Sequence, residues 1–274
     1  MKSFKTHLAA MICSAIVSTV LAASAEDKQG FVTVVRVQGN ATYSLGPNQA
    51  QHPLVAGKYL APGSIIFTKE NAFVDIVLGK TVDFPQATST PNAITPAADY
   101  PVRGYVSYTP SVDQNTVRLT PNTTLAIDKL TVEDTGSDTV SDTELDLQKG
   151  KIFASVRKLT GASQYVIKLP DGVAGVRGTK FSLDVNHNCA CSESTGGGVV
   201  MAIPDGSGGT ETLVIPPGQF FNPGTGSVGP MPPGLLQDLH AIFKSLSTSY
   251  FGLVTFQRDF TECHISPTQG IKQH

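Results

Sequence analysis

The sequence predicts an all-β protein of many short strands, either rolled or stacked or arranged as a sandwich, with one amphipathic helix near the C-terminus. Three observations carry this prediction. Charged residues make up only 15% of the 274 residues. Glycine and proline are abundant, at 26 and 18 residues. Apolar and polar residues alternate over short stretches that end in turn-forming residues. These features exclude a helical bundle, a coiled coil and a highly charged disordered chain.

Residues 1–25 are expected to be a secretory signal peptide. Lys2 and Lys5 precede the apolar run Leu8–Leu21, and Ala23–Ala25 has the A-x-A pattern of a cleavage site before Glu26. We therefore expect an exported protein, periplasmic or extracellular. No later stretch is long and apolar enough to span a bilayer, so we expect no transmembrane segment in the mature chain.

The region from residue 26 to residue 230 is predicted to form one β-domain. Its strands are indicated by period-2 alternation bounded by turns such as Pro170-Asp171-Gly172. The clearest predicted strands are Phe31–Val37, Ala72–Leu78, Leu125–Leu130, Tyr165–Leu169, Phe181–Val185 and Leu213–Ile215.

An insertion at 83–115 interrupts this domain. Phe84–Gln114 is rich in proline, alanine, threonine and tyrosine and has little periodicity. We expect it to project as a surface excursion, with a short hairpin at Arg103–Thr109, because loops this long rarely lie inside a compact domain.

Residues 231–274 are predicted to form a helix followed by a tail. Pro232 and Pro233 mark the start of the helix, and Gly252 lies beyond its end. We expect its apolar face to dock on the β-domain; a helix that binds a partner or a membrane surface is the alternative. The residues of this face are Leu235, Leu236, Leu239, Ile242, Phe243 and Leu246.

The most distinctive motif is a corner between the Pro170-Asp171-Gly172 turn and the strand that contains Phe181. Gly175 and Gly178 are predicted to bracket this corner, because glycine turns where a side chain would clash. Arg177 lies between them, and its guanidinium could pair with backbone carbonyls left without strand partners. We therefore expect Arg177 to be buried and structural, with ligand binding as the alternative.

Val176, Arg177, Gly178, Thr179 and Phe181 carry a resemblance to the FecR-type domain family, named after a periplasmic regulator of iron-dicitrate uptake. The weaker parts of the pattern are similar too, and the resemblance extends over roughly residues 57–222. It implies an exported, non-enzymatic β-domain used for protein contacts or ligand sensing, whose partner is another envelope protein. The weaker matches are Phe73–Gly79, Val117–Leu125, Leu145–Ile152, Val199–Ile203 and Pro217–Phe220.

Three cysteines remain after the signal peptide, and an exported compartment permits disulfides. We expect Cys263 to pair with either Cys189 or Cys191, which would tie the tail to the body. The alternative is a zinc site made by these cysteines with His187 and His264, but the spacing matches no common zinc pattern. We therefore expect no metal and no cofactor.

No catalytic motif is present: the sequence has neither Gly-x-Ser-x-Gly nor His-Glu-x-x-His. The formal net charge of −2 gives no electrostatic reason to bind nucleic acid. The leading hypothesis is therefore a non-enzymatic interaction or sensing module. An envelope structural protein or adhesin is the second hypothesis, and a secreted hydrolase is the third.

Overall fold

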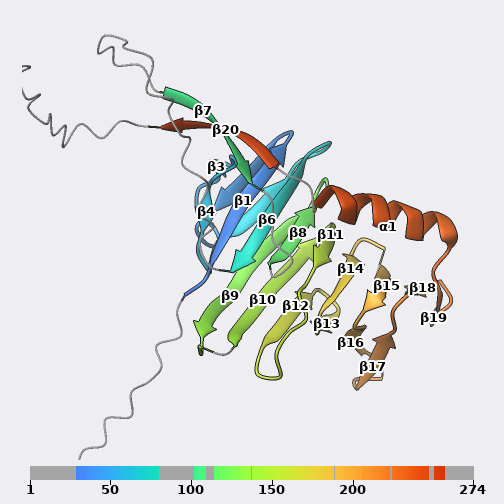
Figure 1. The fold of residues 1–274 in the computed structure, drawn as a ribbon. Helices are drawn as coiled ribbons and strands as arrows, with labels where there is room; N and C mark the ends of the chain where they lie inside the picture. The colour runs from blue at the N-terminus through green and yellow to red at the C-terminus, as the bar shows by residue number, and fades with distance from the viewer. Residues whose placement is uncertain are drawn as a thin grey trace, which may run out of the picture.

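The computed structural model describes residues 29–79, 102–108, 114–136, 138–187, 189–205, 207–222, 224–246 and 250–256. Within the described ranges, strands predominate and form two large sheets, and there is one helix, of 14 residues (Figure 1). The predicted fold class is therefore confirmed. The predicted signal peptide and the tail after residue 256 lie outside the described residues.

Each large sheet has nine strands. All the paired strands are antiparallel except β10 and β12, which are parallel. Sheet A contains, in spatial order, β17 (Thr210–Ile215), β16 (Val199–Pro204), β13 (Gly172–Val176), β12 (Gln164–Leu169), β10 (Thr139–Lys149), β9 (Thr124–Asp134), β5 (Ile65–Thr68), β2 (Ala41–Ser44) and β3 (His52–Pro53). Sheet B contains β19 (Ser227–Pro230), β18 (Gln219–Asn222), β15 (Cys189–Gly196), β14 (Thr179–Asp184), β11 (Lys151–Ser155), β8 (Asn115–Leu119), β6 (Phe73–Gly79), β1 (Phe31–Gln38) and β4 (Tyr59–Leu60).

The main core lies between the two sheets. Alternate residues of each strand point inward, as Tyr165 and Ile167 do from sheet A and Phe181 and Leu183 do from sheet B. All four side chains belong to one buried cluster, so the sheets form two layers around a common core. The sequence left rolled and layered arrangements open, and the structure has layers.

A small third sheet corrects one expectation. The predicted hairpin at Arg103–Thr109 is wrong, because β7 (Val102–Tyr108) is a single strand that pairs antiparallel with β20 (Tyr250–Phe256). The partner strand comes from beyond the helix, which local sequence could not reveal. Residues 80–101, which make up most of the predicted insertion, lie outside the described residues.

The helix α1 (Pro233–Leu246) covers part of the outer face of sheet B (Figure 1). Leu239, Phe243 and Leu246 are buried, and the ring of Phe243 meets that of Phe153 edge-on at a centroid distance of 6.3 Å. The predicted docking of the helix on the β-domain is confirmed. Among the described residues, no helix has the length and apolarity needed to cross a membrane.

A buried ion pair lies on the same outer face, near the end of α1. Asp75 of β6 is 0% exposed and accepts two hydrogen bonds from Arg118 of β8, at 2.7 and 2.8 Å. Arg36 of β1 lies 3.6 Å from the same carboxylate, and Arg118 also donates to Ser245 of α1 at 2.7 Å. Cross-strand pairing aligns Arg36, Asp75 and Arg118, so this network connects three strands to the helix.

Candidate interaction face and pockets

The corner motif is the place where the chain crosses from sheet A to sheet B. Val176 ends β13 and Phe181 lies in β14, and both side chains are buried in the common core. Gly178 lies between the two strands with a φ of +107°, which L side chains rarely adopt. A Cβ at Gly178 would lie 2.6 Å from the Cα of Lys158. Glycine is therefore required at this crossover.

Arg177 is exposed at the crossover, so the expectation that it is buried is wrong. Backbone donors from neighbouring segments already pair two carbonyls of the corner. The N–H of Gly197 donates to the Gly178 carbonyl at 2.8 Å, and the N–H of Val156 donates to the Thr179 carbonyl at 3.0 Å. Because these acceptors are paired, the corner does not need the guanidinium.

The outer face of sheet A carries exposed valines that the sequence analysis did not single out. Val173 of β13, Val200 of β16 and Val214 of β17 are 40%, 44% and 55% exposed. Val200 pairs with Val214 on one side and with Gly175 on the other, and Val166 of β12 pairs with Gly175. The four valines 166, 173, 200 and 214 therefore form one patch across adjacent strands, called the valine face below.

Gly175 leaves a hollow of about 280 Å³ in the valine face. Val166, Val200 and Arg177 are among the residues that line it. Gly175 itself is part of β13. The sequence analysis predicted that it would lie at the corner, and that prediction is wrong. Its backbone does not adopt a positive φ, and an added Cβ would meet only the Val200 carbonyl oxygen, at 3.8 Å. The hollow could accept an apolar side chain from a partner.

Acidic residues adjoin the valine face on β9 and β10. Lys168 of β12 lies 3.0 Å from Asp128 and 3.1 Å from Glu144. Lys168 donates hydrogen bonds to Asp128 and then to Glu144, and these bonds raise the pKa of the lysine. Lys129 of β9 lies 2.7 Å from Asp142. Four carboxylates thus surround two lysines, and we call the four carboxylates the acidic stripe. Its members are Asp128, Asp142, Glu144 and Asp146.

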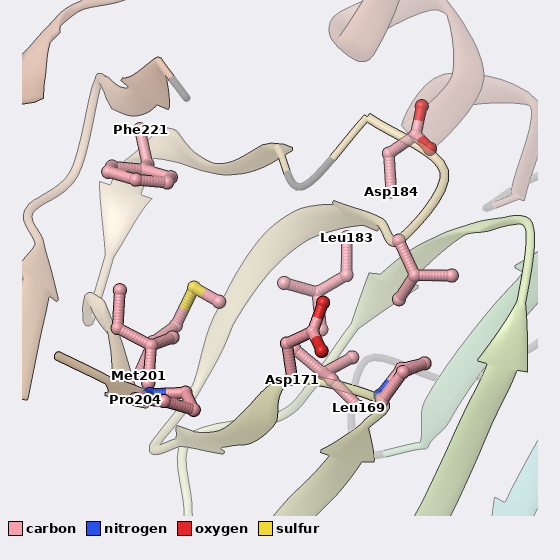
Figure 2. Close-up of a pocket in the computed structure, with 10 residues that line it drawn as sticks. Leu169, Asp171, Leu183, Asp184, Met201, Pro204 and Phe221 are labelled. Atoms are coloured by element: carbon pink, nitrogen blue, oxygen red, sulfur yellow. The ribbon is translucent and has the colours of Figure 1, made fainter. Parts of the chain in front are cut away.

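An apolar pocket of about 360 Å³ opens between the two sheets at the C-terminal end of β12 (Figure 2). Leu169 and Met201 line it from sheet A, and Leu183 and Phe221 line it from sheet B. Asp171, in the turn that follows β12, contributes a carboxylate. The pocket could therefore hold an apolar group beside one negative charge.

A second carboxylate at this pocket, that of Asp184, is engaged by its own turn. It accepts hydrogen bonds from the backbone N–H groups of Asn186 and His187, at 3.1 and 3.3 Å, and lies 2.9 Å from His187 Nδ1. These contacts are typical of an aspartate that stabilises a turn. Among the described residues, no group of three or more histidine, cysteine or acidic side chains could hold a metal ion.

Comparison with known proteins bears on the crossover and the valine face. Residues 108–201 match the FecR protein family. This match confirms the resemblance seen in the sequence and supports a regulatory or sensing role. No curated protein matches the chain.

Two solved structures, each of a candidate anti-sigma factor from Parabacteroides distasonis ATCC 8503, are similar to part of the chain. Their sequences are 14% and 12% identical to it, with TM-scores of 0.32 and 0.30. Each similarity covers 47% of this chain, and it covers 55% and 60% of the lengths of those two chains.

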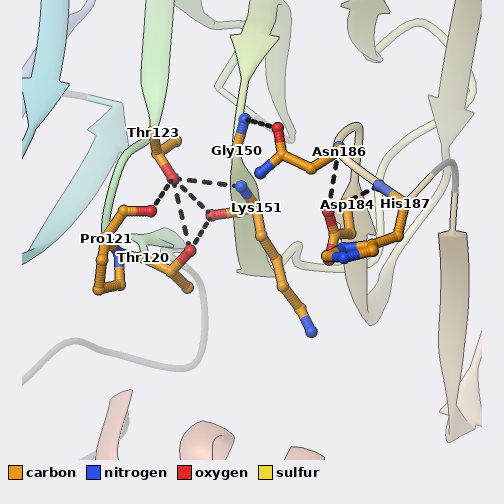
Figure 3. A network of polar contacts seen from close by, with 8 residues as sticks. All are labelled: Thr120, Pro121, Thr123, Gly150, Lys151, Asp184, Asn186 and His187. Atoms are coloured by element: carbon orange, nitrogen blue, oxygen red, sulfur yellow. Dashed lines mark hydrogen bonds and ion pairs between the residues drawn. The ribbon is translucent and has the colours of Figure 1, made fainter. Parts of the chain in front are cut away.

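Residues of the weaker FecR pattern meet where the turn between β8 and β9 contacts the turn between β10 and β11 (Figure 3). Thr123 donates from its hydroxyl to the Lys151 carbonyl at 3.2 Å and accepts from the Lys151 N–H at 3.1 Å. Gly150 adopts a φ of +90°, and a Cβ there would lie 2.6 Å from the Cα of Thr123. The glycine and threonine of the FecR segment are thus needed to bring two turns into contact.

Of the three cysteines singled out by sequence, Cys191 is buried beneath α1 with Phe153 and Phe243. The side chain of Cys189 and the whole of Cys263 lie outside the described residues, as does His264. The bridge from Cys263 therefore remains a prediction.

We expect the exported protein to contain that one bridge. Intact-mass measurement before and after reduction should show a gain of about two daltons, because a disulfide takes up two hydrogens when it is reduced. Peptide mapping should place Cys263 in the bridged pair. An unchanged mass on reduction would contradict the prediction.

Proposed function

We propose that this chain is an exported, non-enzymatic FecR-like module that binds another protein of the bacterial envelope and acts in sensing or regulation. The FecR match over residues 108–201 supports this role. The observation that carries the binding proposal is the valine face, because Val166, Val173 and Val200 lie within the matched segment. The predicted signal peptide supports export.

The valine face suggests the chemistry of the partner. Contiguous exposed apolar surface is typical of interaction sites. The hollow over Gly175 is suited to one apolar anchor side chain, and such buried anchors contribute most of the binding energy in protein interfaces. The neighbouring acidic stripe favours basic residues around that anchor. We therefore propose a partner surface with an apolar side chain flanked by lysine or arginine.

The Gly175→Val variant tests this interaction without removing any group of the protein. The added side chain should fill the hollow while the fold is retained, because a Cβ at this position makes only an ordinary contact. We expect binding to the partner to weaken by at least about tenfold, the effect of losing one buried anchor.

The partner itself is to be captured with a photo-crosslinking residue placed at Val200 in envelope preparations. Val55 is the matched control, because it is 59% exposed and lies near β3 and β4, at the far edge of both sheets. We expect one protein to be crosslinked from position 200, lost in the Gly175→Val background and not captured from position 55. Equal capture from both positions, or capture that survives Gly175→Val, would favour the structural-protein or adhesin hypothesis.

A further inference from the structure

A second cavity lies between the sheets at the N-terminal end of β10, and its lining combines polar and apolar residues. Since β10 and β12 are parallel, this cavity is at the opposite end of the two layers from the apolar pocket of Figure 2. Its volume is about 210 Å³. The lining residues used below are Asn115, Ser141, Thr143, Arg157, Leu130 and Val132.

Two buried hydroxyls at this cavity have no hydrogen-bond partner among the described residues. They are Ser141 Oγ and Thr143 Oγ1, in residues that are 5% and 0% exposed. Both lie on the inward side of β10, two positions apart. Folded proteins rarely leave buried polar groups unpaired, because each one forfeits its hydrogen bonds to water. Because both residues also line the cavity, a bound molecule could complete their hydrogen bonding.

Two further side chains of the lining, those of Arg157 and Asn115, can donate hydrogen bonds. Arg157 donates from Nη2 to the Thr139 carbonyl at 3.1 Å, which holds the guanidinium at the cavity. Asn115 Oδ1 accepts the backbone N–H of Arg157 at 2.9 Å, which fixes the orientation of the amide and leaves its NH₂ group as a donor. Among the described residues that line the cavity, none has a carboxylate. One positive charge and several donors thus face a space with no negative charge of its own.

From this arrangement we propose that the cavity binds a small organic carboxylate. Arginine pairs with carboxylates through two parallel hydrogen bonds, and the hydroxyls of Ser141 and Thr143 can donate to the same group. The walls contributed by Leu130 and Val132 favour a ligand with a short aliphatic part over an inorganic anion. This site is separate from the valine face and does not depend on the proposed protein partner.

Sodium butyrate is the probe, with butyramide as its neutral analogue and inorganic phosphate as the inorganic anion. Melting temperature and calorimetric titration of the full mature protein are the measurements. We expect butyrate to raise the melting temperature and to bind measurably, and butyramide and phosphate to have little effect. Absence of any butyrate effect would mean that water alone fills the cavity, and the proposal would be wrong.

The variants Thr143→Val and Ser141→Ala identify the site. Each removes an unpaired hydroxyl, so the free protein should melt at the wild-type temperature or above it. Butyrate binding should nevertheless weaken by about tenfold in Thr143→Val, because a hydrogen bond to a charged group is lost. Thr210→Val, on an exposed residue of β17, is the control and should bind as the wild type does. Equal butyrate affinity in Thr143→Val and wild type would overturn the assignment.

Discussion

Replacing Gly178 by alanine is expected to lower the free energy of unfolding by about 3 kcal/mol or more. Two costs combine. The residue would have to hold a φ of +107°, and its Cβ would lie 2.6 Å from the Cα of Lys158 and 2.9 Å from the carbonyl oxygen of Arg157. Those contacts are backbone atoms, which cannot move aside as a flexible side chain does. Denaturant unfolding of the purified variant measures the loss.

Two neighbours in the same motif provide matched controls. Gly175→Ala should change the free energy of unfolding by less than about 1 kcal/mol. Inside a strand, the backbone does not use the extra conformations that only glycine can adopt. Arg177→Ala should change it by no more than about 0.5 kcal/mol, as expected for an exposed side chain. If Arg177→Ala were as damaging as Gly178→Ala, the guanidinium would have a structural role that its exposure does not indicate.

Replacing Arg118 by alanine is expected to lower the free energy of unfolding by about 3–5 kcal/mol, the usual cost of breaking a buried ion pair from one side. Asp75 is 0% exposed and would lose both of its short hydrogen bonds from Arg118. Arg36, whose Nε lies 3.6 Å from the same carboxylate, remains as a second and longer ion pair, but the two short hydrogen bonds from Arg118 are gone. The contact between the sheet and Ser245 of α1 would be lost as well.

A double variant separates the ion pair from the packing of the arginine stem. Arg118→Met combined with Asp75→Leu removes both charges and keeps apolar volume. We expect it to recover more than half of the stability lost in Arg118→Ala, because an apolar pair of similar size often replaces a buried ion pair at little cost. Chemical denaturation of both variants at the same pH tests this. A double variant no more stable than Arg118→Ala would show that the buried carboxylate is not the main cause of the loss.

The strands and the helix could be predicted because their signals are local. Tyr165 and Ile167 alternate with polar residues at period 2, and that period places their side chains on one face of a strand. The apolar face of the helix repeats at the helical period between prolines and a later glycine. Both patterns follow from backbone geometry, which each segment carries in its own residues.

Contacts between distant segments could not be predicted in the same way. The pairing of β7 with β20 depends on which segments lie together in the fold. The exposure of Arg177 has a similar cause, since Gly197 and Val156 come from other parts of the chain to pair the carbonyls of the corner. The sequence showed that the corner needs donors, and only the tertiary structure showed that they are backbone N–H groups.

Local sequence patterns were enough to predict the fold class, the docked helix and the corner of the FecR-like motif. The tertiary structure alone revealed the valine face. Val199, Val200 and Met201 form a short apolar run of the kind expected in a strand covered on both sides. Val199 and Met201 are buried in the core, whereas Val200 is 44% exposed. Whether an apolar strand face is buried depends on the layer that packs against it, and sheet B packs against only one side of sheet A.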